Sequence, residues 1–152
     1  MPNAGGSLPA NLEDVDWAYV AGFIDADGSV GIERRKRASG EVGYSVKLYI
    51  TNADRSTMDW LVSNLEGSVY LTNRHSPKHH QTMWRWVVRG KKAGPLLREL
   101  LPYLRLKKKR AELALRFVET ITNGGRLDPE SKRLREYLAN QLTRMNFRGR
   151  PR

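Results

Sequence analysis

Residues 20–28 combine small and apolar side chains with two carboxylates and a final glycine, in the order VAGFIDADG. The pattern predicts a helix that continues to Ala26, so that Asp25 and Asp27 lie at its C-terminal end. That end carries the negative pole of the helix dipole, where each acid is disfavoured by about 0.3–1 kcal/mol unless a positive group lies beside it. A divalent cation fits this place, because hard cations prefer carboxylate oxygens as ligands. The segment therefore predicts a metal-dependent reaction site.

The charge of the chain indicates a polyanionic partner. The 152 residues include 27 Lys and Arg against 16 Asp and Glu, which gives a formal net charge of +11. Such an excess in a chain with 39% hydrophobic residues favours a nucleic acid backbone. A membrane surface is the weaker alternative, because no segment reads as a basic helix with an uninterrupted apolar face. The absence of cysteine excludes disulfides and thiolate zinc sites, so any metal must bind oxygen or imidazole.

The length predicts one domain. Residues 1–12 read as a flexible lead-in, residues 13–145 as the domain, and residues 146–152 as a basic tail that we expect to be disordered. The first residues have neither an apolar core nor a positive start, and no stretch is long enough to span a membrane. We therefore expect an intracellular protein of the cytoplasm or an organelle matrix, which is neither secreted nor bound to a membrane.

Hydrophobic periodicity predicts an α+β domain with an antiparallel four-stranded sheet. The first helix begins at Asp14 or Asp16, and Gly28 is expected to stop it in a left-handed conformation. The remaining predicted elements are strands over 29–37 and 44–51, a helix capped by residues 52–54, strands over 68–74 and 82–89, and helices over 91–101, 105–121 and 128–144.

Alternation along these strands places apolar side chains on one face and polar or basic ones on the other. In the last strand the two faces are ambiguous, and we favour Trp84 and Trp86 as core with Arg85 on the open face. Arginine contacts phosphates or guanine, and short polar groups read other bases, so the open face is a candidate groove-binding surface. Its members are Glu33, Arg35, Arg37, Ser45, Lys47, Tyr49, Thr51, Ser68, Tyr70, Thr72, Arg74 and Arg85.

Three segments carry a resemblance to one family. Residues 20–29, VAGFIDADGS, resemble the signature of the LAGLIDADG homing endonucleases and differ from it at Val20 and Phe23. Residues 50–54 (ITNAD) look like the strand-to-helix junction of that family, and residues 101–109 (LPYLRLKKK) look like its later proline-leucine-lysine segment. With one copy of the signature, the chain resembles the homodimeric branch. The resemblance implies an αββαββα core with a DNA-binding saddle, followed by C-terminal helices.

The first predicted helix has a stripe suited to close packing. Ala18, Gly22 and Ala26 recur every four residues, and small residues at this spacing let a second helix backbone approach closely. A twofold axis through such a contact brings both copies of Asp27 to one place, where the carboxylates stay ionised only with metal between them. The predicted dimer interface consists of Ala18, Gly22, Asp25 and Ala26.

The resemblance also implies the chemistry. It is a magnesium-dependent double-strand break in a long, near-palindromic DNA target, made by an intron-encoded endonuclease. Asp27 is the implied metal ligand, together with the backbone carbonyl of Ala26, and Mn²⁺ or Ca²⁺ can occupy the same site. Asp25 either binds metal or braces the helix end, and the sequence leaves both roles open.

Two further residues are predicted in the catalytic site. Lys107 continues the apolar stripe of Ala111, Ala114 and Val118, so it lies on a packed side and needs an anionic partner. The resemblance gives it a role near the transition state or the water network. Asn52 stands where the family often has glutamine, in the pocket that positions water.

Other interpretations use the same fold. The chain could be an RNA maturase that binds intron RNA, or a DNA-binding regulator that does not cleave; a structural RNA-binding protein explains the charge but not the motif. The histidines at positions 75, 79 and 80 are interpreted as exposed or DNA-contacting rather than as metal ligands.

Overall fold

The strands of a computed structural model pair into one antiparallel four-stranded sheet in the order β1-β2-β4-β3. The structure describes residues 11–72, 81–121 and 127–147. The predicted α+β class and strand number are confirmed. The elements are α1 (Asp14–Asp27), β1 (Gly28–Lys36), β2 (Val42–Asn52), α2 (Arg55–Leu65), β3 (Ser68–Leu71), β4 (Trp84–Arg89), a 3₁₀ turn η1 (Gly90–Lys92), α3 (Ala93–Leu100), α4 (Lys108–Glu119) and α5 (Pro129–Phe147).

The sheet forms because apolar side chains alternate along its strands. Val46, Leu48 and Ile50 of β2 are fully buried, and the residues between them lie on the opposite face. The β1–β2 register runs from Gly28 opposite Ile50 to Lys36 opposite Val42. Because β2 also pairs with β4, the two hairpins join through their inner strands, and β1 and β3 are the sheet edges.

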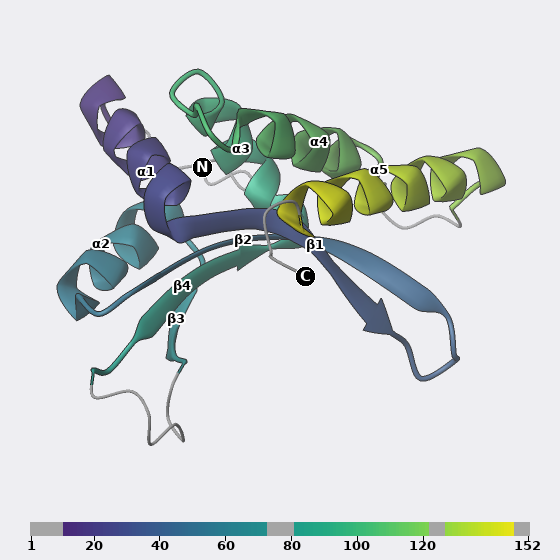
Figure 1. Cartoon of the computed structure of the whole chain (residues 1–152), viewed down its shortest axis with the longest axis horizontal. Helices are drawn as coiled ribbons and strands as arrows, with labels where there is room; N and C mark the ends of the chain where they lie inside the picture. Colours follow the sequence, from purple (N-terminus) through teal and green to yellow (C-terminus); the bar gives the residue numbers. More distant parts are fainter. Residues whose placement is uncertain (1–10, 73–80, 122–126, 148–152) are drawn as a thin grey trace.

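The helices cover one face of the sheet. In Figure 1 the helices lie above the strands, with α2 at one end, and no described helix lies on the lower, concave side. The buried apolar side chains of α1, α3, α4 and α5 meet those of β1, β2 and β4 in one core. The fold therefore leaves one curved sheet surface free of the chain's own helices, as a groove-binding saddle requires.

The burial of its side chains shows which face of β4 belongs to the core. Trp86 is fully buried, and its indole N–H donates to the carbonyl of Glu66 at 2.8 Å. Trp84 is half-buried and packs against the core, with the guanidinium of Arg55 4.2 Å from its ring centre. Arg85 hydrogen bonds to Thr51 of β2 on the opposite face. The tryptophans thus belong to the core face and Arg85 to the open face.

Several predicted boundaries need correction. The third strand ends at Leu71 rather than at residue 74, and the fifth helix continues to Phe147 rather than ending near 144. The helix before Pro102 is divided into η1 and α3, and α4 begins at Lys108 rather than at 105. Arg74, the three histidines and most of the predicted lead-in and tail lie outside the described residues.

Gly28 ends α1 for a different reason from the predicted one. Its backbone is extended, with φ of −99°, which residues other than glycine adopt freely. A Cβ at this position, however, would lie 2.8 Å from the Cα of Ile24 and 3.0 Å from the carbonyl oxygen of Tyr49. The glycine is required because the last turn of α1 and the backbone of β2 both lie close to this position, so the constraint is steric. No described helix is long and apolar enough to cross a membrane.

We expect Gly28→Ala to lower the free energy of unfolding by about 1–3 kcal/mol, the usual cost of overpacking a core. Urea denaturation measures this change. Ser29→Ala changes the neighbouring residue without such a contact, and is expected to stay within about 0.5 kcal/mol of the parent. Equal stability of the two variants would contradict the steric explanation.

Candidate functional site

The C-terminal end of α1 is held by the segment that precedes α4. The carboxylate of Asp25 accepts hydrogen bonds from the backbone N–H groups of Arg105 and Lys107, at 2.8 and 3.0 Å. In return, Lys107 Nζ donates to the carbonyl oxygens of Ile24 and Asp25 at 2.7 and 2.8 Å. The two segments therefore bind each other reciprocally, and the positive charge expected at this helix end comes from the chain itself.

The ammonium group of Lys107 is partly removed from water. Burial lowers the pKa of Lys107 below its ordinary value, and Arg110 acts in the same direction. The carboxylates of Asp25 and Asp27 act in the opposite direction. Lys107 thus has the anionic surroundings predicted from its place on the packed side, but its direct partners are main-chain carbonyls. It is the N-cap of α4 rather than a residue within the helix.

Asp27 and Asn52 meet beside this helix end. Asp27 is the last residue of α1 and Asn52 the last of β2, and Gly28 pairs with Ile50 where the two elements join. Asn52 Nδ2 lies 3.5 Å from Asp27 Oδ2, a long contact. The other side of the amide accepts the backbone N–H of Asp54 at 2.9 Å. The fold thus brings the predicted Asp27, Asn52 and Lys107 to one end of α1.

One chain supplies few metal ligands at this place. Within residues 11–72, 81–121 and 127–147, no group of three or more His, Asp or Glu side chains is arranged to hold a metal ion. Asp27 is exposed, so its carboxylate is accessible, and Ala26 adds a backbone carbonyl one residue earlier. Magnesium is usually held by one or two carboxylates together with phosphate oxygens and water. Among the described residues, Asp27 and the carbonyl of Ala26 therefore fit part of a divalent-cation site, and the remaining ligands would have to come from elsewhere, such as a phosphate and water.

The open face of the sheet has a row of basic and polar side chains. The strand register places Lys47 beside Arg89 and Thr51 beside Arg85. Arg85 Nε donates to Thr51 Oγ1 at 2.9 Å, and its guanidinium lies 4.2 Å from the centre of the Tyr49 ring. Lys47 Nζ lies 5.3 Å from the same ring. These contacts hold the cations in position before any partner binds.

Glu33 is surrounded by cations on this face. Its Oε2 accepts hydrogen bonds from Arg35 Nη2 at 3.1 Å and from Arg89 Nε at 3.2 Å. Its Oε1 lies 3.8 Å from Lys47 Nζ. Burial raises the pKa of the Glu33 carboxyl, but the charges of Lys47, Arg35 and Arg89 outweigh it. The net result is a pKa below the ordinary value, so the carboxylate stays ionised at neutral pH.

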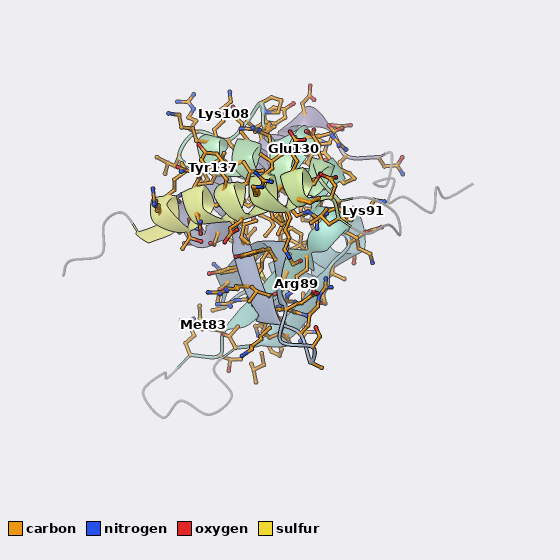
Figure 2. The ribbon with its side chains drawn as sticks, turned by 90° about the vertical axis from the view of Figure 1, so that its right-hand side faces the viewer. Met83, Arg89, Lys91, Lys108, Glu130 and Tyr137 are labelled. Atoms are coloured by element: carbon orange, nitrogen blue, oxygen red, sulfur yellow. The ribbon has the colours of Figure 1, made fainter. Side chains whose placement is uncertain are left out.

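Arg89 is the functional candidate that the sequence analysis missed. It lies four residues after Arg85 on β4, so strand alternation places both on the open face. That signal was present in the sequence. Figure 2 shows Arg89 on the sheet, below α5.

The other predicted open-face residues have varied surroundings. Ser68 and Tyr70 are exposed on β3, and Ser45 is half-buried on β2. Thr72 lies just beyond β3, where its hydroxyl donates to the carbonyl of Met83 at 3.2 Å. Arg37 lies beyond the end of β1, in the turn of the first hairpin, where its backbone N–H donates to Glu41. Both positions correct the sequence-based expectation that these residues lie on strands.

The small-residue stripe of α1 faces away from its own domain. Ala18, Gly22 and Ala26 are all exposed, and a Cβ at Gly22 would meet no atom within 4 Å. Val15 and Tyr19 extend this surface and are 68% and 54% exposed. The predicted interface member Asp25 differs from the others, because its carboxylate binds residues 105–107 of its own chain. Of the two roles left open for Asp25, its contacts favour the brace.

A family model for the LAGLIDADG endonucleases matches residues 20–121. The chain belongs to the LAGLIDADG endonuclease family. The matched residues of this LAGLIDADG domain include Asp27, Asn52 and Lys107, together with both hairpins of the sheet. Helix α5 lies beyond the match. The predicted family is therefore confirmed.

Individual relatives support the same assignment. DNA endonuclease I-CvuI of Chlorella vulgaris is 28% identical over 121 residues, which cover 76% of this chain and 71% of the relative. The crystal structure of homing endonuclease I-CvuI with its target DNA and calcium has a TM-score of 0.76 at 25% identity, over 91% of this chain and 86% of that chain.

More distant LAGLIDADG structures share the fold. The archaeal intron-encoded homing endonuclease I-Vdi141I, complexed with DNA, has a TM-score of 0.74 at 21% identity, over 93% of this chain and 90% of its own. The I-SmaMI homing endonuclease bound to cleaved DNA has a TM-score of 0.67 at 20% identity. That match covers 84% of this chain but 43% of I-SmaMI, so the LAGLIDADG fold seen here corresponds to under half of the longer protein.

The contacts of Lys107 predict a stabilising role. We expect Lys107→Met to lower the free energy of unfolding by about 1–2 kcal/mol, because it removes a partly buried cation from the C-terminal end of a helix. Lys108→Met is the matched control, since Lys108 is exposed on the next position, and is expected to change stability by about 0.5 kcal/mol or less. Chemical denaturation measures both, and equal values would refute the role.

The two acids of the motif should respond oppositely to the same substitution. Asp25→Asn places an amide against two backbone N–H donors, and is expected to cost about 1–3 kcal/mol. Asp27→Asn removes an exposed charge from the negative end of α1, and is expected to stabilise the fold by about 0.3–1 kcal/mol. Thermal unfolding without divalent cations measures both. A loss of stability in Asp27→Asn as large as in Asp25→Asn would contradict this division of roles.

Proposed function

We propose that the protein is a homing endonuclease that makes a magnesium-dependent double-strand break in a long, near-palindromic DNA site, and that it acts as a homodimer. The observation that carries the proposal is the exposed stripe of α1, which leads directly to the accessible carboxylate of Asp27. Family membership and the DNA complexes of I-CvuI support it. One of these complexes was obtained with calcium and the other with magnesium, and in the magnesium complex the DNA is not cleaved; they support binding of DNA, while magnesium dependence is part of the proposal.

The homodimer follows from an incomplete site and an uncovered helix face. Within the part of the chain that the structure describes, this place offers Asp27 and the backbone carbonyl of Ala26, whereas cleavage of both strands requires two reacting phosphates. A twofold contact between the stripes of two α1 helices covers Val15 and Tyr19 and brings the two Asp27 residues together. Gly22 permits the closest approach, because the space above it is open.

The residues at the end of α1 then have separate tasks. Asp27 and the carbonyl of Ala26 hold the cation, which supplies activation of water and charge neutralisation at the phosphate when bound. The amide of Asn52, whose Nδ2 lies 3.5 Å from Asp27 Oδ2, would orient that carboxylate and would have a second N–H for a water molecule. Lys107 and Asp25 fix the position of the helix end. Two of the three Nζ donors of Lys107 are used on α1 carbonyls, so its third donor remains for a phosphate oxygen or water.

The open face of the sheet binds the DNA duplex in this proposal. Its basic residues neutralise phosphates and its short polar side chains reach base edges in the major groove. Arg85 is already stacked on Tyr49 and bonded to Thr51, so little side-chain entropy is lost when it meets DNA.

Cleavage tests the proposal directly. We expect the protein to cut members of a plasmid library of candidate sites when Mg²⁺ is present, and Asp27→Asn to bind DNA while cutting at least a thousandfold more slowly. Asp59→Asn makes the same chemical change in an exposed acid of α2 that pairs with Arg55, and should retain activity. Sequencing of the plasmids identifies the site. Cleavage that persists in Asp27→Asn would refute the metal assignment, and tight binding to intron RNA without any cleavage would favour a maturase.

The assembly is tested separately. Gly22→Leu is expected to weaken the dimer at least tenfold, because a large side chain separates helices that pack through small residues. Glu136→Leu adds the same side chain to an exposed position of α5 and should leave the dimer unchanged. Analytical ultracentrifugation over a concentration series measures both. A parent protein that is monomeric on cleaved DNA would overturn the homodimer.

A further inference from the structure

Glu33 is an acid on a face that otherwise suits an anionic partner. Among the strand residues that the structure describes, the open-face positions contain this one carboxylate beside Lys47, Arg85 and Arg89. An unpaired acid here would repel phosphate and the acceptor groups of the major groove. Arg35, Lys47 and Arg89, the three cations that pair with Glu33, offset that repulsion, so the carboxylate can approach bases.

The oxygens of the Glu33 carboxylate are used unequally. Oε2 accepts two hydrogen bonds, from Arg35 and Arg89, at 3.1 and 3.2 Å. Oε1 lies 3.8 Å from Lys47 Nζ, which is an ion pair beyond hydrogen-bond distance. An ionised carboxylate can accept about four hydrogen bonds. Oε1 therefore has acceptor capacity for a donor on the DNA.

The cluster matches the edge of one kind of base pair. In the major groove cytosine presents the N4 amino donor, and its partner guanine presents the O6 and N7 acceptors. Glutamate accepts from cytosine N4, while arginine or lysine donates to guanine. Glu33 has Lys47 and Arg89 within 4 Å of its carboxylate, so an acceptor and donors lie side by side. A thymine in the place of the cytosine would present its O4 acceptor to the carboxylate, which is unfavourable.

We propose that Glu33, with Lys47 and Arg89, reads a C·G base pair in each half of the DNA target. The inference rests on the proposed function and adds a specificity-determining residue to it. Arg35 has a different task, because its side chain is 63% exposed and can reach the phosphate backbone. The ion pairs with Glu33 fix the direction of the cations, and the open oxygen of Glu33 selects cytosine.

Selection from a randomised DNA library tests the base preference. The parent protein, with Ca²⁺ in place of Mg²⁺ so that binding is scored without cleavage, should enrich sites with a C·G pair at one symmetric position of each half. Glu33→Gln should lower the preference for C·G over A·T at that position at least tenfold, because glutamine pairs well with adenine. Glu41→Gln removes the same charge from an exposed residue of the same hairpin and should leave the preference unchanged.

A second measurement uses the parent protein alone and so does not depend on the folding of a variant. Replacement of the paired guanine by 7-deazaguanine removes the N7 acceptor, and should weaken binding about tenfold at this position but not at a position outside the contact. The inference is overturned if Glu33→Gln raises affinity equally for all sequences, or if the parent enriches sites without the C·G pair. Either result would leave the proposal that the protein binds and cleaves DNA intact. A protein that enriches no DNA contradicts the endonuclease proposal as well.

Discussion

The reciprocal contact between Asp25 and Lys107 is the constraint on which the site depends. A helix end that carries two acids and a negative dipole is unstable alone. Here one acid accepts two backbone N–H groups from residues 105–107, and the lysine of that segment donates to two carbonyls of the helix. Because the two segments fix each other, the remaining acid, Asp27, stays exposed at a defined position. A cation bound there, as proposed, would have less unfavourable charge to offset.

On the open face of the sheet, as at the helix end, charged side chains are paired with groups of their own chain. Basic side chains gathered on one face repel one another, which costs stability before any partner arrives. Tyr49 lies under Arg85 and near Lys47, and Glu33 lies among the other cations. These contacts spread the positive charge and also restrict the side chains to directions from which DNA can be contacted. The helices on the opposite face (Figure 1) supply the apolar core that keeps the sheet curved and rigid.

Much of this arrangement could be predicted from local patterns. Alternation in β2 identified both faces of the sheet, because a side-chain period of two is a property of the strand itself. The motif placed Asp27 at the end of α1, where it is the exposed last residue, and its role as a metal ligand stays a prediction. Helical spacing indicated that Lys107 lies on a packed side. The prediction was wrong about the conformation of Gly28, which is extended; its place is tight because of Ile24 on α1 and Tyr49 on β2, and the contact with Tyr49 is long-range, so no local pattern contains it. It was also incomplete for Arg89, whose position four residues after Arg85 was not used.

The sequence by itself determined the class of fold, the basic character of the open face and the location of the acids at a helix end, since these follow from periodicity, composition and residue order. Only the tertiary structure decided which partner each charge has. Asp25 and Lys107 are separated by 82 residues, and Glu33 and Arg89 by 56. Such pairs depend on how the helices and strands pack, because the energy of a charge depends on what lies within a few ångströms of it. That packing made Asp25 a brace for the helix end and left the carboxylate of Asp27 accessible.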